Sequence, residues 1–264
     1  MQLNTEKMIG EKEGGVGWMT FNNPARRNAM ALEMWSAVEA ILDEFESDDA
    51  IKVIVMKGAG DKAFVSGADI SEFSERRNNA EAAAEYARIS EGARARLLAV
   101  KKPLIAMIQG YCLGGGMAVA MAADMRFASD DSQFGIPAAR LSIAYGFDGL
   151  HKLVHLVGPA LASEIMFTAR RVEPEEAQRI GLINRAVPLD DLESTVREVA
   201  NAICRNAPLS INASKYTIGQ ILTDKEDRDY DEIKRLSKMC FDSNDYKEGR
   251  EAFMEKRSPV FSGS

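Results

Sequence analysis

Three consecutive glycines, Gly114 to Gly116, lie between a strand-like segment and the helical segment that follows it. Without Cβ atoms the backbone can approach a ligand and turn its N–H groups toward it. The start of the following helix adds its positive dipole end at the same place. The loop therefore suits an anion, or an oxygen that gains negative charge during a reaction. The same glycines would also suit a tight turn that needs them for steric reasons alone.

A second loop, Ser66-Gly67-Ala68-Asp69, also follows a strand and opens a helical segment. We expect it to offer one more backbone N–H to the same oxygen, which would complete an oxyanion hole with two donors. For Asp69 we expect a capping role, because an Asp at a helix start bonds free backbone N–H groups. Substrate contacts are predicted at Ser66, Gly67 and Asp69 in this loop, and at Gly114 and Gly116 in the other.

The elements that must position these loops alternate between strands and helices. Short β-branched runs at Val16 to Phe21 and Ile51 to Lys57 predict strands, and apolar residues at helical spacing from Ala31 to Phe45 predict a helix between them. The same patterns then predict a helix over about 80–100, a strand at 104–108, a helix at 117–122 and strands at 125–128 and 133–135. This alternation indicates an α/β protein.

The last quarter of the chain shows helical patterns only. Amphipathic runs lie at roughly 192–204, 209–222 and 230–240, and a short one at 246–256. Helices that carry apolar stripes without following strands must bury them on their own core or on another copy of the chain. We therefore expect an α/β core over residues 1–200 and a helical oligomerisation region over residues 201–264.

Composition narrows the class of partner. The formal charge is -7, the pI is near 5.1, and 46% of residues are apolar. An acidic chain is a poor ligand for nucleic acid or an anionic membrane, so we expect a small-molecule substrate. Three scattered cysteines without a Cys-x-x-Cys pair, no visible export signal and no apolar run of about 18 residues predict a soluble, cytoplasmic protein without a metal site.

Five segments together resemble the enoyl-CoA hydratase/isomerase (crotonase) superfamily, nearly end to end. They are KAFVSGADI at 62–70, LIAMIQGYCLGGG at 104–116, QFGIPAARLSI at 133–143, EIMFTARRVEPEEAQRIGLIN at 164–184 and FMEKRSP at 253–259. The resemblance implies a spiral of strand-strand-helix units, a C-terminal helical trimerisation region, and a homotrimer or a hexamer built as a dimer of trimers.

The resemblance also implies the ligand and its contacts. In the family the substrate is an acyl-CoA thioester, and the backbone N–H groups that match Ala68 and Gly115 hold its carbonyl oxygen. Coenzyme A enters as part of the substrate, and no separate cofactor is implied. Arg26 and Arg27 match residues that contact CoA, and Lys256 matches a basic residue that a neighbouring subunit supplies. Each of these three side chains would also suit a solvated surface.

This sequence departs from the family pattern where hydratases carry two glutamates. Those positions are Ala118 and Ala138, and alanine can neither take nor give a proton. Both alanines are expected to line the substrate pocket and to leave room for another group.

Nearby polar residues offer other chemistry. Arg140, Tyr145 and Asp148 lie in the segment that walls the acyl pocket in relatives, and we take Tyr145 and Asp148 as catalytic candidates. Tyr145, with Gly149 and His151, also resembles the methylmalonyl-CoA decarboxylase branch, although that branch has a histidine where this chain has Ala68. Tyr145 would equally suit a core position with a satisfied hydroxyl.

The leading hypothesis is a thioester enzyme of the hydratase/isomerase type, either a lyase or an isomerase, that stabilises an enolate in the backbone hole. The first alternative is decarboxylation of a malonyl-type thioester, with Tyr145 and Arg140 at the carboxylate. This reaction needs a desolvating pocket and an oxyanion hole but no carboxylate base. The second alternative is an acyl-CoA binding protein without catalysis.

Overall fold

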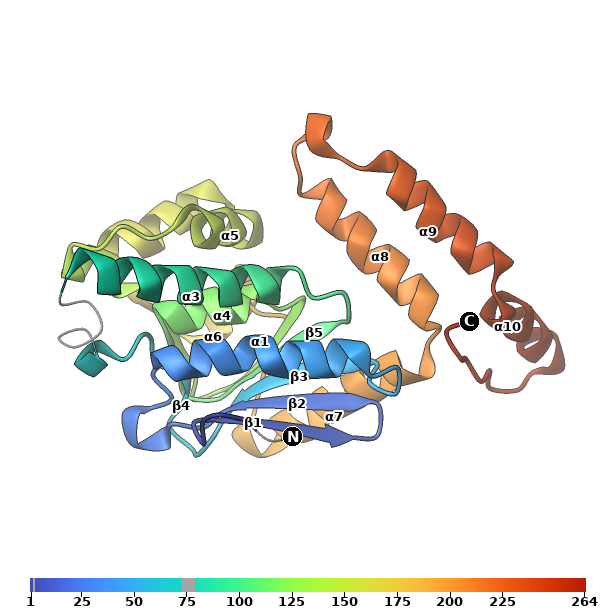
Figure 1. The fold of residues 1–264 in the computed structure, drawn as a ribbon, viewed down its shortest axis with the longest axis horizontal. Helices are drawn as coiled ribbons and strands as arrows, with labels where there is room; N and C mark the ends of the chain where they lie inside the picture. The colour runs from blue at the N-terminus through green and yellow to red at the C-terminus, as the bar shows by residue number, and fades with distance from the viewer. Residues whose placement is uncertain (2, 73–78) are drawn as a thin grey trace.

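Two β-sheets form the body of the molecule in the computed structural model, which describes residues 1, 3–72 and 79–264 (Figure 1). The larger sheet has the spatial order β1 (Met8–Glu13), β2 (Val16–Phe21), β3 (Val53–Gly58), β5 (Leu104–Ile108), β7 (Met125–Ser129), β10 (Arg185–Val187). The smaller sheet has the order β4 (Ala63–Val65), β6 (Tyr111–Leu113), β8 (Gln133–Gly135), β9 (Arg171–Val172).

The chain places one strand in each sheet before it enters a helix. This happens in β3, β4 and α3 (Ala80–Leu98), then in β5, β6 and α4 (Gly115–Ala122), and then in β7, β8 and α5 (Phe147–Thr168). Strands β3, β5 and β7 are parallel in one sheet, and β4, β6 and β8 are parallel in the other. The predicted α/β class and the spiral of strand-strand-helix units are confirmed.

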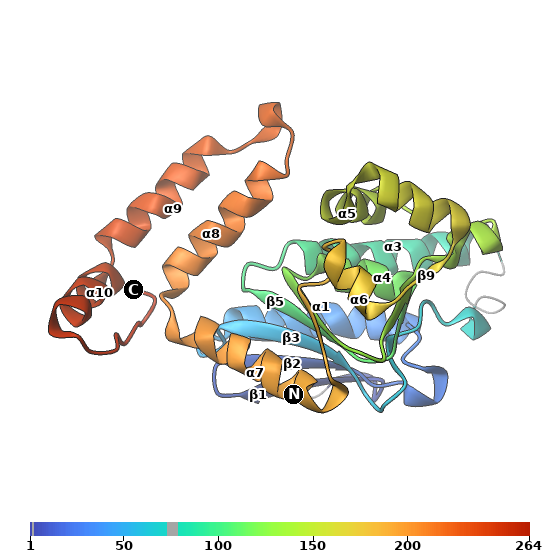
Figure 2. The same ribbon diagram turned by 180° about the vertical axis from the view of Figure 1, so that it is seen from behind.

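The central strands of the larger sheet are covered on both faces. Alternate residues of a strand point to opposite sides, so each of these strands contributes to two cores. In β3, Ile54 and Met56 face α1 (Leu32–Ser47) in the main core, and Val53 and Val55 face α7 (Leu189–Arg205) in a second, smaller core. Figure 2 shows α7 against the sheet on the side away from α1. The first of the predicted tail helices therefore belongs to the body, and the expected boundary at residue 200 falls inside it.

The last three helices form an arm that extends away from the two sheets (Figures 1 and 2). They are α8 (Pro208–Ile221), α9 (Tyr230–Asp242) and α10 (Asn244–Glu255), as the amphipathic runs predicted. Large apolar side chains stay exposed along the arm and its C-terminal extension, namely Ile218, Ile221, Leu222, Tyr230, Met239, Phe241, Tyr246, Phe253, Met254 and Val260. Within the described residues, no helix is both long enough and apolar enough to cross a membrane.

These exposed apolar faces lead to a testable expectation about assembly. Phe253 and Met254 keep about four-fifths of their surface exposed, and patches of this kind are typical of protein interfaces. We expect size-exclusion chromatography with light scattering to give a mass well above the 29.0 kDa of one chain. A mass that stays at 29.0 kDa over a dilution series would contradict both the trimer and the hexamer.

Candidate active site

Neighbouring strands of the smaller sheet bring the two predicted loops together. Strand β4 leads into the Ser66–Asp69 loop and β6 leads into the glycine loop, and these two strands are parallel partners. Because the carboxyl ends of parallel strands meet at one edge of a sheet, the loops that follow them are adjacent. The next strand, β8, leads into a short 3-10 helix, η3 (Pro137–Leu141), which carries Ala138 to the same edge. The Gly114 N–H donates to the Gly135 carbonyl at 2.8 Å and ties the second loop to the third.

The backbones of Ala68 and Gly115 face each other closely. A Cβ built on Gly115 would lie 3.6 Å from the Ala68 nitrogen. Gly115 begins α4, so its N–H has no carbonyl within the helix to bond. Among the described residues, neither the Ala68 N–H nor the Gly115 N–H donates a hydrogen bond. Two backbone N–H groups without an acceptor among the described residues therefore lie close together where the sequence predicted an oxyanion hole.

Gly116 has a steric role. A Cβ at this position would lie 2.0 Å from the Val65 carbonyl oxygen, so only glycine fits between α4 and β4. We expect Gly116→Ala to lower the free energy of unfolding by about 1–3 kcal/mol, as overpacking in a core does. Gly115→Ala is the matched control, since its added Cβ would meet nothing closer than 3.6 Å. Urea denaturation of both variants tests this, and equal midpoints would contradict the steric role.

The loop that precedes α1 is bound to the Ser66–Asp69 loop. The Ser66 N–H donates to the Arg27 carbonyl at 3.1 Å, and the Ser66 hydroxyl donates to the Arg26 carbonyl at 3.3 Å. Buried Asn28 holds the turn, because its amide donates to the carbonyls of Ala59 and Ala63 at 2.9 and 2.7 Å. The backbone of Arg26 and Arg27 is thus held beside the Ser66–Asp69 loop.

Ala68 and Gly115 both line a cleft of about 930 Å³. It runs between α3 and α5, over one face of α4. Of the predicted site residues it is lined by Arg26, Ser66, Gly67, Ala68, Asp69, Gly114, Gly115, Ala118, Ala138, Tyr145 and Asp148. Both Ala118 and Ala138 therefore line this cleft. The candidate hole and the predicted acyl pocket are one continuous site.

The polar candidates differ in how free they are to react. The Tyr145 hydroxyl donates to the Gly114 carbonyl at 3.2 Å, so it supports the glycine loop. Burial raises the pKa of its phenol, with a smaller contribution from Cys112, and nearby Arg94 acts in the opposite direction. The Tyr145 hydroxyl therefore stays neutral at neutral pH and acts as a hydrogen-bond donor. Asp148 is exposed at the start of α5. Asp69 is engaged as expected, because it accepts from the N–H and hydroxyl of Ser71 at 3.0 and 2.6 Å.

Four predicted substrate contacts lie outside the cleft lining. Arg140 is exposed on η3, which argues against its expected place at a substrate carboxylate. Gly116 is buried behind the loop, and the Arg27 guanidinium lies 5.3 Å from the centre of the Tyr111 ring. Lys256 follows the last residue of α10 in the arm, and its contact with CoA stays a prediction.

Three charged residues of the cleft were not predicted. Glu91 and Arg94 come from α3, and Lys152 comes from α5. The signal was present in the helical spacing, since Glu91, Arg94, Ala95 and Leu98 are spaced to share one helix face and all four line the cleft. Burial lowers the pKa of the Lys152 ammonium. Arg94 and Lys152 nevertheless place two basic side chains in the cleft lining that the motifs did not reveal.

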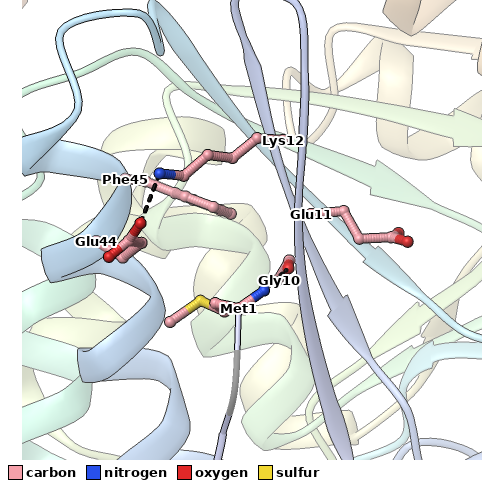
Figure 3. Close-up of a pocket in the computed structure, with 6 residues that line it drawn as sticks. All are labelled: Met1, Gly10, Glu11, Lys12, Glu44 and Phe45. Atoms are coloured by element: carbon pink, nitrogen blue, oxygen red, sulfur yellow. Dashed lines mark hydrogen bonds and ion pairs between the residues drawn. The ribbon is translucent and has the colours of Figure 1, made fainter.

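A smaller hollow of about 430 Å³ lies between β1 and α1 (Figure 3). It is lined by Met1, Gly10, Glu11, Lys12, Glu44 and Phe45. Its Lys12 ammonium pairs with Glu44 at 2.6 Å and with Asp48 at 2.7 Å, and the terminal amine of Met1 donates to the Gly10 carbonyl at 3.3 Å. These charges are already engaged, which leaves the cleft at α4 as the candidate active site.

Known proteins share this fold and much of this sequence. Residues 11–264 match the family profile described as enoyl-CoA hydratase/isomerase. The short-chain-enoyl-CoA hydratase of Clostridium acetobutylicum is 37% identical, over 97% of both chains. The crotonyl-CoA hydratase of Syntrophomonas wolfei is 35% identical, over 97% of this chain and 98% of its own.

A solved structure gives the same answer for the fold. An enoyl-CoA hydratase/carnithine racemase from Magnetospirillum magneticum superposes with a TM-score of 0.93 at 33% identity, over 99% of this chain and 97% of that one. Sequence motifs, spiral topology and both comparisons agree, and the chain belongs to the enoyl-CoA hydratase/isomerase family.

Proposed function

We propose that this protein binds an acyl-CoA thioester in the cleft at α4 and stabilises the thioester enolate with the N–H groups of Ala68 and Gly115. One observation carries the proposal, namely the two adjacent N–H groups without acceptors among the described residues. Free donors fixed before the reaction cost no reorganisation when charge develops on the carbonyl oxygen. Removing one such donor typically costs about 2.7–4 kcal/mol of transition-state stabilisation.

The reaction that follows enolate formation differs from ordinary hydration. Ala118 and Ala138 both face the cleft, so neither position supplies the carboxylate that would activate water. General acid–base catalysis is typically worth about 10²–10⁴-fold, and this contribution is missing at both positions. We infer slow hydration of simple enoyl-CoA substrates and a faster lyase or isomerase reaction. Asp148, which lines the cleft three residues after Tyr145, is the candidate carboxylate for this reaction.

Decarboxylation of a malonyl-type thioester is the second candidate function. It needs a place that removes water from the leaving carboxylate and a hole for the resulting enolate. The alanine pair and the half-buried Tyr145 favour it, because they surround the hole with apolar surface and a neutral hydroxyl. Arg140 no longer supports it, since this side chain is exposed and outside the cleft lining.

The experiment is product analysis by mass spectrometry with enoyl-, methylmalonyl- and 3-hydroxyacyl-CoA thioesters. Loss of carbon dioxide establishes the second candidate, and a gain of water as fast as in a two-glutamate hydratase contradicts the inferred slow hydration. For thioesters that bind without a change in mass, exchange of the α-proton in D₂O is followed by NMR. Absence of both turnover and exchange would overturn the proposal in favour of an acyl-CoA binding protein.

Assembly and location complete the proposal. In a trimer or hexamer, Lys256 of a neighbouring copy would reach the CoA held near Arg26. The cytosolic location expected from the cysteines stays a prediction.

Charge reversal at Lys256 would separate the two proposed roles of the arm, which are assembly and contact with CoA. Loss of CoA affinity without loss of assembly indicates a direct contact.

A further inference from the structure

The guanidinium of Arg94 is the feature of the cleft that the proposed reaction does not use. Arg94 is half-buried on α3 and lines the cleft with Ala118 and Tyr145. Within the described residues, no carboxylate forms an ion pair with it. A half-buried arginine without a counter-charge is unusual, because charges removed from water are normally paired.

The surroundings of Arg94 hold it in place without occupying its donors. Its guanidinium lies 5.7 Å from the ring centre of buried Trp35 on α1. A cation in this position is attracted by the face of the ring, and the contact leaves the planar N–H groups of the guanidinium available. These five donors form a fork that matches the two oxygens of a carboxylate.

The other charges of the cleft favour an anion at the same place. Lys152 lines the cleft from α5, is half-buried, and has no ion-pair partner within the described residues. The acidic residues are placed differently, because Glu91 and Asp148 are exposed and Asp69 is bonded to Ser71. The inner wall therefore presents the cations of Arg94 and Lys152. The acidic side chains of the cleft are exposed to solvent or bonded within their own turn.

Arg94 and the candidate oxyanion hole come from different helices of the same cleft. Helices α3 and α4 lie side by side (Figure 1) and end close together, because the Leu104 N–H that follows α3 donates to Asp124, which follows α4, at 2.7 Å. Arg94 lies about one turn before the end of α3, whereas Gly115 starts α4. We therefore assign a carboxylate held by Arg94 to the acyl chain, on the α3 side of the cleft, and not to the thioester carbonyl.

We propose that the acyl group of the substrate ends in a carboxylate, which the guanidinium of Arg94 binds inside the cleft. The substrate class is then a dicarboxylic acyl-CoA thioester whose distal carboxylate is retained in the product. This inference rests on the proposed function, because it names the acyl group for the same site.

Binding calorimetry of non-enoyl thioesters tests the inference without requiring turnover. The pairs are succinyl-CoA with butyryl-CoA, glutaryl-CoA with pentanoyl-CoA, and adipyl-CoA with hexanoyl-CoA, which differ only in a terminal carboxylate or methyl group. We expect at least one dicarboxylic thioester to bind about 10- to 100-fold more tightly than its partner, as charge-assisted hydrogen bonds allow. Arg94→Gln is expected to abolish this preference, and Arg94→Lys to restore part of it.

Arg88→Gln is the matched control, because Arg88 lies on the same helix, is exposed and pairs with Glu85 at 2.7 Å outside the cleft. It should leave the preference unchanged, and unchanged affinity for the methyl-ended thioester shows that Arg94→Gln still folds. Equal affinity within every pair, or a preference that survives Arg94→Gln, would overturn the inference. Tight dicarboxylate binding without turnover and without α-proton exchange would support it while overturning the proposed reaction. If no thioester binds, both are overturned.

Discussion

Replacing Gly115 by proline is expected to lower kcat by about 10²–10³-fold for whichever thioester reacts, because the substitution deletes one of the two proposed oxyanion donors. The fold should tolerate the change. Gly115 is the first residue of α4, where proline is favoured because its missing N–H would have had no helical partner. The measurement is steady-state kinetics, or α-proton exchange for a thioester that shows no net turnover.

Gly115→Ala separates the lost N–H from the added side-chain atom. Its Cβ would lie 3.6 Å from the Ala68 nitrogen, an ordinary contact, and its N–H is kept. We expect this variant to stay within about tenfold of the parent, which corresponds to roughly 1.4 kcal/mol. If both variants lose activity equally while circular dichroism shows both folded, crowding of the cleft explains the loss and the Gly115 N–H is not a donor to the substrate.

Installing glutamate at both alanine positions is expected to raise the rate of crotonyl-CoA hydration by about 10²–10⁴-fold. Ala118 and Ala138 face the cleft beside the hole, so carboxylates there would meet the substrate double bond and a water molecule. Ala138 is 7% exposed, and larger side chains at such a site typically cost about 1–3 kcal/mol of stability. Hydration is followed by the loss of enoyl absorbance, with urea midpoints measured in parallel.

The control is the double variant Ala118→Gln with Ala138→Gln. Glutamine has the size of glutamate but cannot exchange a proton at neutral pH, so any gain from changed pocket shape would appear in both variants. A gain confined to the glutamate variant attributes slow hydration to the missing acid and base. Similar rates in the parent and both variants would mean that another group of the cleft already serves this reaction.

Local patterns predicted most elements with accuracy. Strands Val16–Phe21, Leu104–Ile108 and Gln133–Gly135 coincide with the predicted ranges, because alternation and β-branched residues meet clear turn residues on both sides. The strand predicted at 51–57 begins only at Val53. The Ile51 N–H donates to the Asp48 carbonyl and closes the turn after α1, so tertiary context moved the boundary.

In the candidate site, too, some residues could be predicted from the sequence and others could not. The strand and loop pattern predicted the two adjacent loops, and the family resemblance implied Ala68 and Gly115 within them, whose role as donors stays a prediction. Arg94 and Lys152 were missed because they come from helices that approach the loops only in three dimensions. The long helix α5 was also not delimited, since Gly158 with a φ of 78° and Pro159 interrupt its pattern without ending it. Such residues normally predict the end of a helix.

Both proposed donors belong to the main chain, and this affects how the protein tolerates mutation. A point substitution changes a side chain and keeps the peptide N–H, with proline as the sole exception. Random mutagenesis of positions 68 and 115 should therefore recover many active variants, limited only by the space above the loops. We then expect substitutions at Ala118, Ala138 and Arg94, which line the cleft, to change the reaction or the acyl group while the two main-chain donors persist. The cleft is in this sense a favourable starting point for directed evolution.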